Sequence, residues 1–218
     1  MIKKLNKFFE SWETITAGIL ILAGFVVLLL IYGPLLRDEV RYQFSAKGKG
    51  VIVVGEKEQA EKVADEKAGL KIIKPVDENF GIVIPKISAN TKVVAQVDPT
   101  DSKVYQRALT EGVAQAKGSA YPGEEGNIFI FAHSGADLSE AVRYNAVFYL
   151  LGNLTVGDDI FLFRNGEKFR YVVEEKKLVN SSEVKYLKKE NGDHTVTLMT
   201  CWPAGTTLKR LLVIAKQN

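Results

Sequence analysis

The sequence predicts a mainly β fold: a closed β-barrel of about seven or eight short strands with short helices, preceded by one N-terminal transmembrane helix. Two observations favour the barrel. From Phe80 onwards, short runs of β-branched, aromatic and aliphatic residues alternate with turn residues, and about 140 residues are a comfortable size for one barrel domain. A third observation, an uncharged aliphatic segment near the N-terminus, predicts the membrane helix.

The segment between Glu13 and Arg37 carries no charged residue. Its 23 positions would span about 34 Å as a helix, enough to cross a hydrocarbon core of about 30 Å. The alternative of a buried core helix fits poorly, because the run is apolar on every face and too long. A cleaved signal peptide would have an apolar stretch of about 7–15 residues and a small-x-small cleavage site after it. We therefore expect residues 14–36 to be an uncleaved membrane anchor and residues 1–13 a short cytoplasmic tail.

Residues 37–78 are rich in charge but carry no net charge, with nine basic and nine acidic residues. This composition predicts a charged stalk or linker between the anchor and the barrel. Residues 56–70 have the composition of a solvated helix, and Val51–Val54 form a possible short strand. The barrel domain is expected to occupy residues 79–218.

The barrel strands are expected where apolar and β-branched residues lie between turn signals. The expected strands are 82–87, 91–97, 126–133, 158–163, 169–173, 195–201 and 208–215. The segment 164–167 should join two of them as a hairpin, because Asn165-Gly166 is a typical two-residue turn. Helical patches are expected near residues 102–109 and 146–151.

Composition excludes several classes of function. The net charge of +3 is too small and too dispersed to indicate nucleic-acid binding. No glycine-rich phosphate loop follows a predicted strand. The single cysteine cannot form an intramolecular disulfide, and no Cys/His cluster offers a zinc site. We expect no cofactor, no metal ion and no nucleic-acid partner.

The single cysteine, Cys201, lies at the end of the predicted strand 195–201, just before Pro203 and Gly205 break the pattern. A side chain at a strand end is held by the sheet and yet open to a cleft, which suits a nucleophile. The alternative is that Cys201 is a small buried hydrophobic residue. The other residues near the predicted strand ends bear on this choice.

A cysteine nucleophile needs a proton-transfer partner and a group that stabilises the oxyanion. His194 lies on the same predicted strand as Cys201, roughly 23 Å away, and cannot be the partner. His133 ends a different strand, and two strand ends can meet at one rim of a barrel. Arg210 should face Cys201 across the mouth of a hairpin. The alternatives are a surface role for His133 and a surface ion pair for Arg210.

These residues carry a resemblance to a known family. The segment Thr197-Leu198-Met199-Thr200-Cys201 resembles the TLxTC signature of sortases, the membrane-anchored cysteine transpeptidases of mostly Gram-positive bacterial surfaces. Residues 126–133 are similar to the family's histidine strand, and Arg210 stands where its catalytic arginine is expected. The similarity spans roughly residues 79–218, including 109–113 and 121–123. One departure is Phe131-Ala132-His133, where many members have Ala-Gly-His.

The resemblance implies a reaction. Cys201 would attack the threonine carbonyl of a C-terminal LPxTG-like sorting signal, and Arg210 would hold the oxyanion. His133 would protonate the departing amine and leave a thioacyl enzyme. An amine, from a cell-wall precursor or a pilin lysine, would then resolve that intermediate. The thioester preserves the energy of the cleaved amide, so no nucleotide cofactor is needed.

Residues beside the catalytic positions are expected to bind substrate. They are Ala132 and Ser134, which flank His133, and Thr200 and Trp202, which flank Cys201; Trp202 is equally well suited to cap the barrel. A single-pass type II topology would place the catalytic domain outside the cell. Two alternatives stay open: a membrane-anchored cysteine hydrolase, in which water resolves the acyl enzyme, and a non-enzymatic surface β-barrel module with a structural cysteine.

Overall fold

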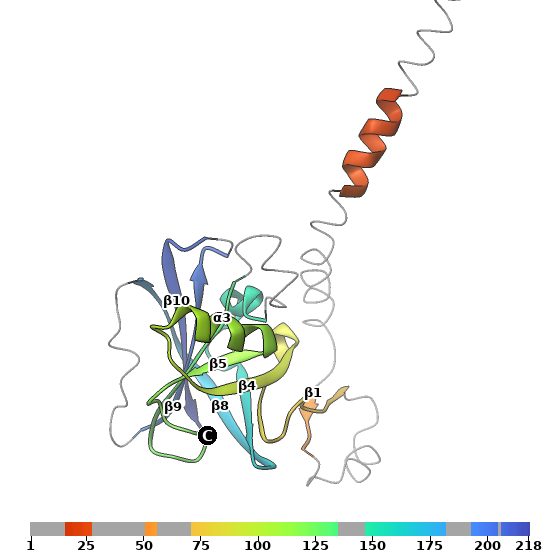
Figure 1. Cartoon of the computed structure of the whole chain (residues 1–218). Coiled ribbons are helices and arrows are strands. Elements are labelled where there is room, and N and C mark those ends of the chain that lie inside the picture. The colour runs from red at the N-terminus through yellow and green to blue at the C-terminus, as the bar shows by residue number, and fades with distance from the viewer. Residues whose placement is uncertain (1–15, 28–50, 56–70, 135–146, 182–192, 205) are drawn as a thin grey trace, which may run out of the picture. The chain divides into compact units, whose positions relative to one another are not determined.

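The structure is a computed structural model that describes residues 16–27, 51–55, 71–134, 147–181, 193–204 and 206–218. The chain divides into two compact units, residues 1–44 and 45–218. In the first unit, residues 16–27 form a helix whose apolar side chains are exposed (Figure 1). Within the described part of the chain, no helix combines the length and apolar character that crossing a membrane requires. The predicted anchor, residues 14–36, extends beyond the described residues.

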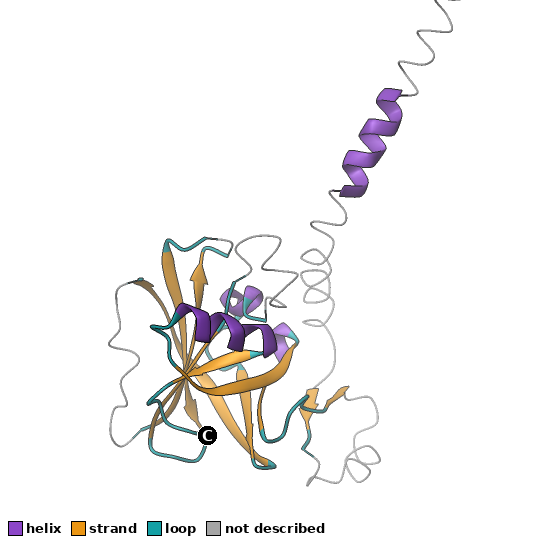
Figure 2. Cartoon of the chain, viewed as in Figure 1, coloured by secondary structure: helices purple, strands orange, loops and turns teal. Residues whose placement is uncertain are grey.

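In the second unit, eight strands close into a barrel in the order β10-β8-β7-β3-β4-β5-β6-β9 (Figure 2). The predicted closed β-barrel is therefore confirmed. The strands are β3 (Phe80–Ile84), β4 (Ala89–Val97), β5 (Val113–Ala116), β6 (Gly126–Phe131), β7 (Asp159–Arg164), β8 (Glu167–Asn180), β9 (His194–Trp202) and β10 (Lys209–Gln217). The helices among the described residues of this unit are α3 (Ser102–Glu111) and the 3₁₀ turns η1 (Pro85–Ile87) and η2 (Tyr149–Asn153).

Local sequence explains where the elements match the prediction and where they do not. The β7–β8 hairpin turns at Asn165 and Gly166, both with positive φ, as a two-residue turn of this kind requires. Residues 85–87 were predicted to continue a strand, and this is wrong: Pro85 has no N–H to donate to a ladder, so the chain turns into η1. The short strand β5, which pairs with β4 and β6, was not predicted.

Strand register separates two faces of the sheet around β9. Leu198 and Val213 are paired neighbours and fully buried on one face. On the other face, Phe131, Met199 and Leu212 lie side by side. They join a cluster that includes Ala108 and Leu109 of α3, and Figure 1 shows α3 lying across the strands on this side. The helix therefore covers an outer face of the barrel.

Helix α3 begins where its sequence predicts. The Asp101 side chain caps the helix by accepting hydrogen bonds from the backbone N–H groups of Lys103 (3.0 Å) and Val104 (3.2 Å). Its apolar side chains then recur at the helical spacing, and Ala108 and Leu109 are buried against the barrel. The cap and the apolar stripe together fix α3 beside β4 and β5, with its apolar face in the cluster that includes Phe131.

Part of the predicted connector packs on the barrel. The expected short strand is confirmed as β1 (Val51–Val53), which pairs in parallel with β2 (Lys71–Ile73). Val53 is 3% exposed and packs with Val83 and Phe163 of the barrel. The predicted helix at residues 56–70 lies outside the described residues, and the boundary at residue 79 stays a prediction.

Hydrogen bonds reinforce this docking. Lys168 Nζ donates to the carbonyl oxygen of Val53 at 3.1 Å. The Asn90 side chain accepts from the Val76 N–H at 2.8 Å and donates to the Lys74 carbonyl oxygen at 2.7 Å. The segments 51–55 and 71–78 are thus tied to strands β4 and β8 as well as to the apolar core.

Candidate active site

The parallel pairing of β6 and β9 places their carboxyl ends at the same rim of the barrel. His133 follows β6 by two residues, and Cys201 is the penultimate residue of β9. Two hydrogen bonds tie these ends together: Ala132 N–H donates to the Met199 carbonyl at 3.2 Å, and the Thr200 hydroxyl donates to the Ala132 carbonyl at 3.1 Å. The structure therefore brings His133 and Cys201 to one rim.

His194 lies at the other end of the same strand pair. It pairs in register with Gly126, the first residue of β6. Its Nδ1 is 3.1 Å from the Glu124 carbonyl oxygen. His194 and Cys201 lie near opposite ends of the same strand, as the sequence predicted. His194 is therefore too far from this cysteine to be its proton-transfer partner.

Arg210 faces Cys201 directly across the β9–β10 pair. Residues opposed in an antiparallel pair project from the same face, with Cβ atoms about 4.5–5.5 Å apart. Arg210 Nη1 donates to the carbonyl oxygens of Thr207 and Lys209, both at 3.2 Å. The predicted hairpin is confirmed, and the preceding residue, Lys209, is exposed and lies opposite Trp202.

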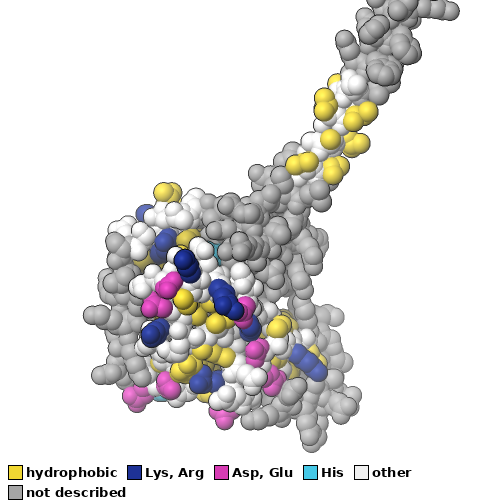
Figure 3. All heavy atoms as spheres, viewed as in Figure 1, with side chains coloured by type: hydrophobic (Ala, Val, Ile, Leu, Met, Phe, Trp, Pro, Cys, Tyr) yellow, Lys and Arg dark blue, Asp and Glu magenta, His cyan; other side chains and the backbone are white. Residues whose placement is uncertain are grey.

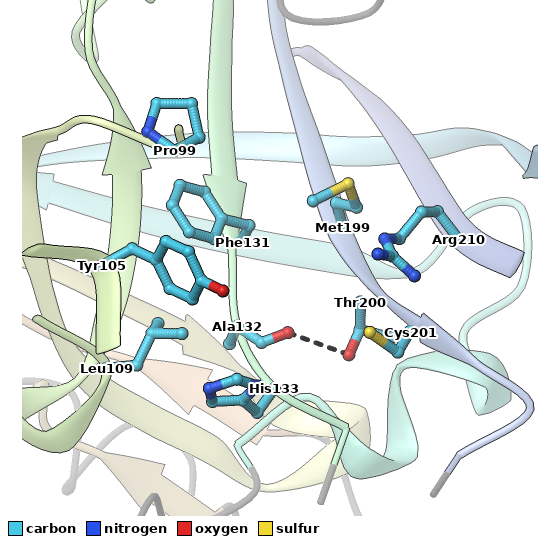
Figure 4. A pocket seen from close by; sticks show the side chains of 10 residues that line it. All are labelled: Pro99, Tyr105, Leu109, Phe131, Ala132, His133, Met199, Thr200, Cys201 and Arg210. Carbon is cyan, nitrogen blue, oxygen red and sulfur yellow. Dashed lines mark hydrogen bonds between the residues drawn. The ribbon is translucent and has the colours of Figure 1, made fainter. Parts of the chain in front are cut away.

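The three predicted catalytic side chains line one cavity of about 180 Å³. Figure 4 shows Tyr105 and Leu109 on one side and Cys201 and Arg210 on the other, with His133 between them. The full lining is Pro99, Tyr105, Leu109, Phe131, Ala132, His133, Met199, Thr200, Cys201 and Arg210. Cys201 is half-buried. The cavity thus combines an apolar wall with the residues expected for thiol chemistry.

Several lining residues were missed by sequence reasoning, although their spacing carried a signal. Tyr105 and Leu109 are four residues apart on α3 and therefore share a helix face. Met199 and Phe131 each precede a predicted catalytic position by two residues, and side chains two apart on a strand share a face. The Tyr105 ring meets Phe131 edge-on, with centroids 6.4 Å apart, which closes the apolar side of the cavity.

The predicted substrate-binding residues have different surroundings. Ala132 and Thr200 line the cavity, although Thr200 is only 2% exposed and its hydroxyl ties β9 to Ala132. Ser134 is 1% exposed, and its hydroxyl has no hydrogen-bond partner among the described residues. The Trp202 ring lies against Gly152 of η2. Contact of these four residues with substrate stays a prediction.

Charge around the cavity is local and mixed. Hydrogen bonds from the Thr100 hydroxyl and backbone N–H hold the pKa of Asp98, next to the lining residue Pro99, below its usual range. On the face drawn in Figure 3, basic and acidic side chains of the barrel unit are interspersed. Within the described ranges, no three His, Cys, Asp or Glu side chains are grouped to hold a metal ion.

Comparison with known proteins agrees with this geometry. The family model described as Sortase domain matches residues 82–218. Sortase D of Bacillus subtilis (strain 168) is 28% identical over 137 residues, which are 62% of this chain and 61% of that protein. The match therefore spans about three fifths of the length of that curated relative.

Solved structures show the same similarity. Sortase C-1 from Actinomyces oris has 32% identity and a TM-score of 0.55, over 66% of this chain and 74% of that chain. Sortase C from Clostridium perfringens, determined with the C-terminal cell wall sorting motif, has 27% identity and a TM-score of 0.52, over 63% of this chain and 69% of that chain. The family match covers more than half of the sequence and includes His133, Cys201 and Arg210, so this chain belongs to the sortase family.

Proposed function

We propose that this protein is a cysteine transpeptidase that cleaves a C-terminal LPxTG-like sorting signal and transfers the acyl group to an amine. The observation that carries the proposal is the convergence of Cys201 of β9, Arg210 of β10 and His133, which follows β6, on one cavity with an apolar wall. That wall suits the leucine and proline of such a signal. The Clostridium perfringens sortase C structure with its sorting motif supports the class of substrate.

In the first step, the Cys201 sulfur attacks the threonine carbonyl carbon. The negative charge that develops on the carbonyl oxygen is stabilised by the Arg210 guanidinium, which carries five N–H donors. Its Nη1 also donates to the carbonyl oxygens of Thr207 and Lys209. The C–N bond then breaks, and His133 gives its proton to the departing amine. The product is a thioacyl enzyme at Cys201.

In the second step, an acceptor amine attacks the thioester carbonyl while His133 takes up a proton from that amine. A new amide forms and the Cys201 thiolate leaves. The acceptor is a cell-wall precursor amine or a pilin lysine. Water in place of the amine would make the protein a hydrolase, and the choice between amine and water is the part of the proposal that most needs measurement.

We further propose that residues 14–36 anchor the protein as a single-pass type II membrane protein with the barrel unit outside the cell. The support is the absence of charge between Glu13 and Arg37. Within this segment the described helix, residues 16–27, exposes its aliphatic side chains, for example Leu20 at 72% and Ile21 at 73%. Such side chains are expected to face lipid.

The test is intact-mass measurement of the barrel unit, residues 45–218, mixed with a panel of LPxTG-like peptides. An acyl adduct on Cys201 that glycine or lysine amines convert into a new peptide supports the transpeptidase, and an adduct released only as free acid supports the hydrolase. Cys201→Ala should form no adduct with any peptide.

The two histidines provide a matched pair of variants. His133→Asn should abolish turnover, because no other described side chain at the cavity can exchange a proton in the same way. His194→Asn should retain wild-type turnover, because His194 lies at the opposite end of β9. Equal loss of turnover in both variants would contradict the assigned role of His133.

A further inference from the structure

We infer that Trp202 is a positioning residue of the active site, and that it acts through a close contact with Gly152. A Cβ atom placed on Gly152 would lie 2.5 Å from Cζ3 and 2.8 Å from Cη2 of Trp202. Neither distance is compatible with two non-bonded carbon atoms. The φ angle of Gly152 lies outside the left-handed range, so the backbone does not require glycine there. Glycine is required instead because the indole of Trp202 occupies the space that a side chain would need.

The contact between Trp202 and Gly152 lies on the face of β9 opposite the Cys201 side chain. Successive side chains of a strand point to opposite faces, so Cys201 faces the cavity with Met199, while Trp202 points to the other side of β9 and packs on η2. The indole therefore restrains the backbone of the residue next to the reacting sulfur without occupying the cavity that receives the substrate.

The platform under the indole is itself held in place. Leu151, next to Gly152, is fully buried, and Leu150 is 8% exposed. Lys176 of β8 donates from Nζ to the Gly152 carbonyl oxygen at 2.6 Å. Apolar burial and this bond to β8 anchor η2. A side chain added at Gly152 would therefore displace the indole of Trp202, because η2 itself is not free to move away.

The same contact also bears on Arg210. Trp202 is the last residue of β9, pairs in register with Lys209 and leads directly into the loop before β10. Within this loop, Thr206 donates both its N–H (2.9 Å) and its hydroxyl (2.8 Å) to the Pro203 carbonyl. The next residue, Thr207, offers the carbonyl oxygen that Arg210 Nη1 binds. Moving the indole off Gly152 therefore disturbs both Cys201 and Arg210.

This inference rests on the proposed function only where turnover is measured. A misplacement of about 1 Å in a reacting group can cost about 100-fold in rate. We expect Gly152→Ala to lower kcat by about 10- to 100-fold and to leave KM nearly unchanged, because the cavity wall of Tyr105, Leu109 and Phe131 is untouched. Gly55→Ala is the matched control, since its Cβ would meet its nearest neighbour, Phe163, at an ordinary 3.4 Å.

The experiment uses the full chain with Trp12→Phe, which leaves Trp202 as the sole tryptophan of the two in the sequence. Indole emission reports on the contact, and alkylation of Cys201, the only cysteine, by iodoacetamide reports on the site without any peptide substrate. Gly152→Ala should shift the emission, change the alkylation rate and lower kcat. Gly55→Ala should change none of them.

A double variant tests the steric cause. In Gly152→Ala with Trp202→Leu, the added methyl group has room, so the double variant should be no slower than Trp202→Leu alone. Wild-type emission in Gly152→Ala would overturn the contact. A shifted emission with wild-type alkylation and kcat would overturn the positioning role. If no peptide is turned over by the unsubstituted protein, emission and alkylation still decide this inference, and the failure belongs to the proposed function.

Discussion

Residues 51–55 should contribute measurably to the stability of the barrel, although they precede the region matched by the family. Val53 is 3% exposed and packs on Val83 and Phe163, which are both fully buried. Val53→Ala removes two buried carbon groups at about 0.8 kcal/mol each and leaves a small cavity. We therefore expect a loss of about 2 kcal/mol in the free energy of unfolding, or a decrease of about 4–8 °C in Tm.

The assay is urea denaturation of the unit 45–218, followed by far-UV circular dichroism. Val51→Ala is the matched control on the same strand, because Val51 is 39% exposed, and it should change stability by less than about 0.5 kcal/mol. A fragment starting at residue 79 lacks β1 and β2 and should be less stable than Val53→Ala, because it exposes part of Phe163. Equal midpoints for the fragments 45–218 and 79–218 would refute the reasoning.

Two further predictions concern the site and the core. Arg210→Ala should lower kcat/KM by about two to three decades, as the loss of an oxyanion donor typically does. Lys209→Ala is the control, because Lys209 is an exposed neighbour, and it should leave kcat/KM unchanged. Steady-state kinetics with the preferred peptide measures both variants, and a near-normal rate in Arg210→Ala would remove Arg210 from the mechanism. Burial raises the pKa of the Tyr171 phenol above its ordinary value of 10.0. The native state therefore holds this proton more tightly than the unfolded chain. The contribution of the Tyr171 proton to the free energy of unfolding is fully present below about pH 10 and is lost as the pH rises above that value. Urea denaturation at pH 9 and pH 11 should show a smaller decrease for Tyr171→Phe than for the wild type; an identical decrease would contradict this.

The sequence was most informative where chemistry and periodicity coincide. The Asn165-Gly166 turn, the single cysteine at a strand end and the arginine across the hairpin each follow from local rules. Local rules also excluded His194, because distance along a strand is set by its number of residues. Pro85 was a local signal that should have ended the predicted strand at Ile84.

What the sequence did not show depends on contacts between distant segments. β5 has no strong β-forming run and is a strand because β4 and β6 pair with it on both sides. The docking of Val53 on Phe163 joins residues from opposite halves of the chain. Likewise, the sequence alone does not explain the glycine at position 152. The structure does, because the ring of Trp202 occupies the space that a side chain there would need.

The bond from Thr200 to Ala132 joins positions 68 residues apart, and its consequence concerns the timing of folding. Contacts between segments so far apart form late, because the intervening loop must close first. Until β9 has added to both β6 and β10, the chain carries an ordinary thiol with neither His133 nor Arg210 beside it. The proposed acyl transfer is therefore expected only of the completed barrel, and the rate at which a refolding sample gains it is expected to report barrel closure itself.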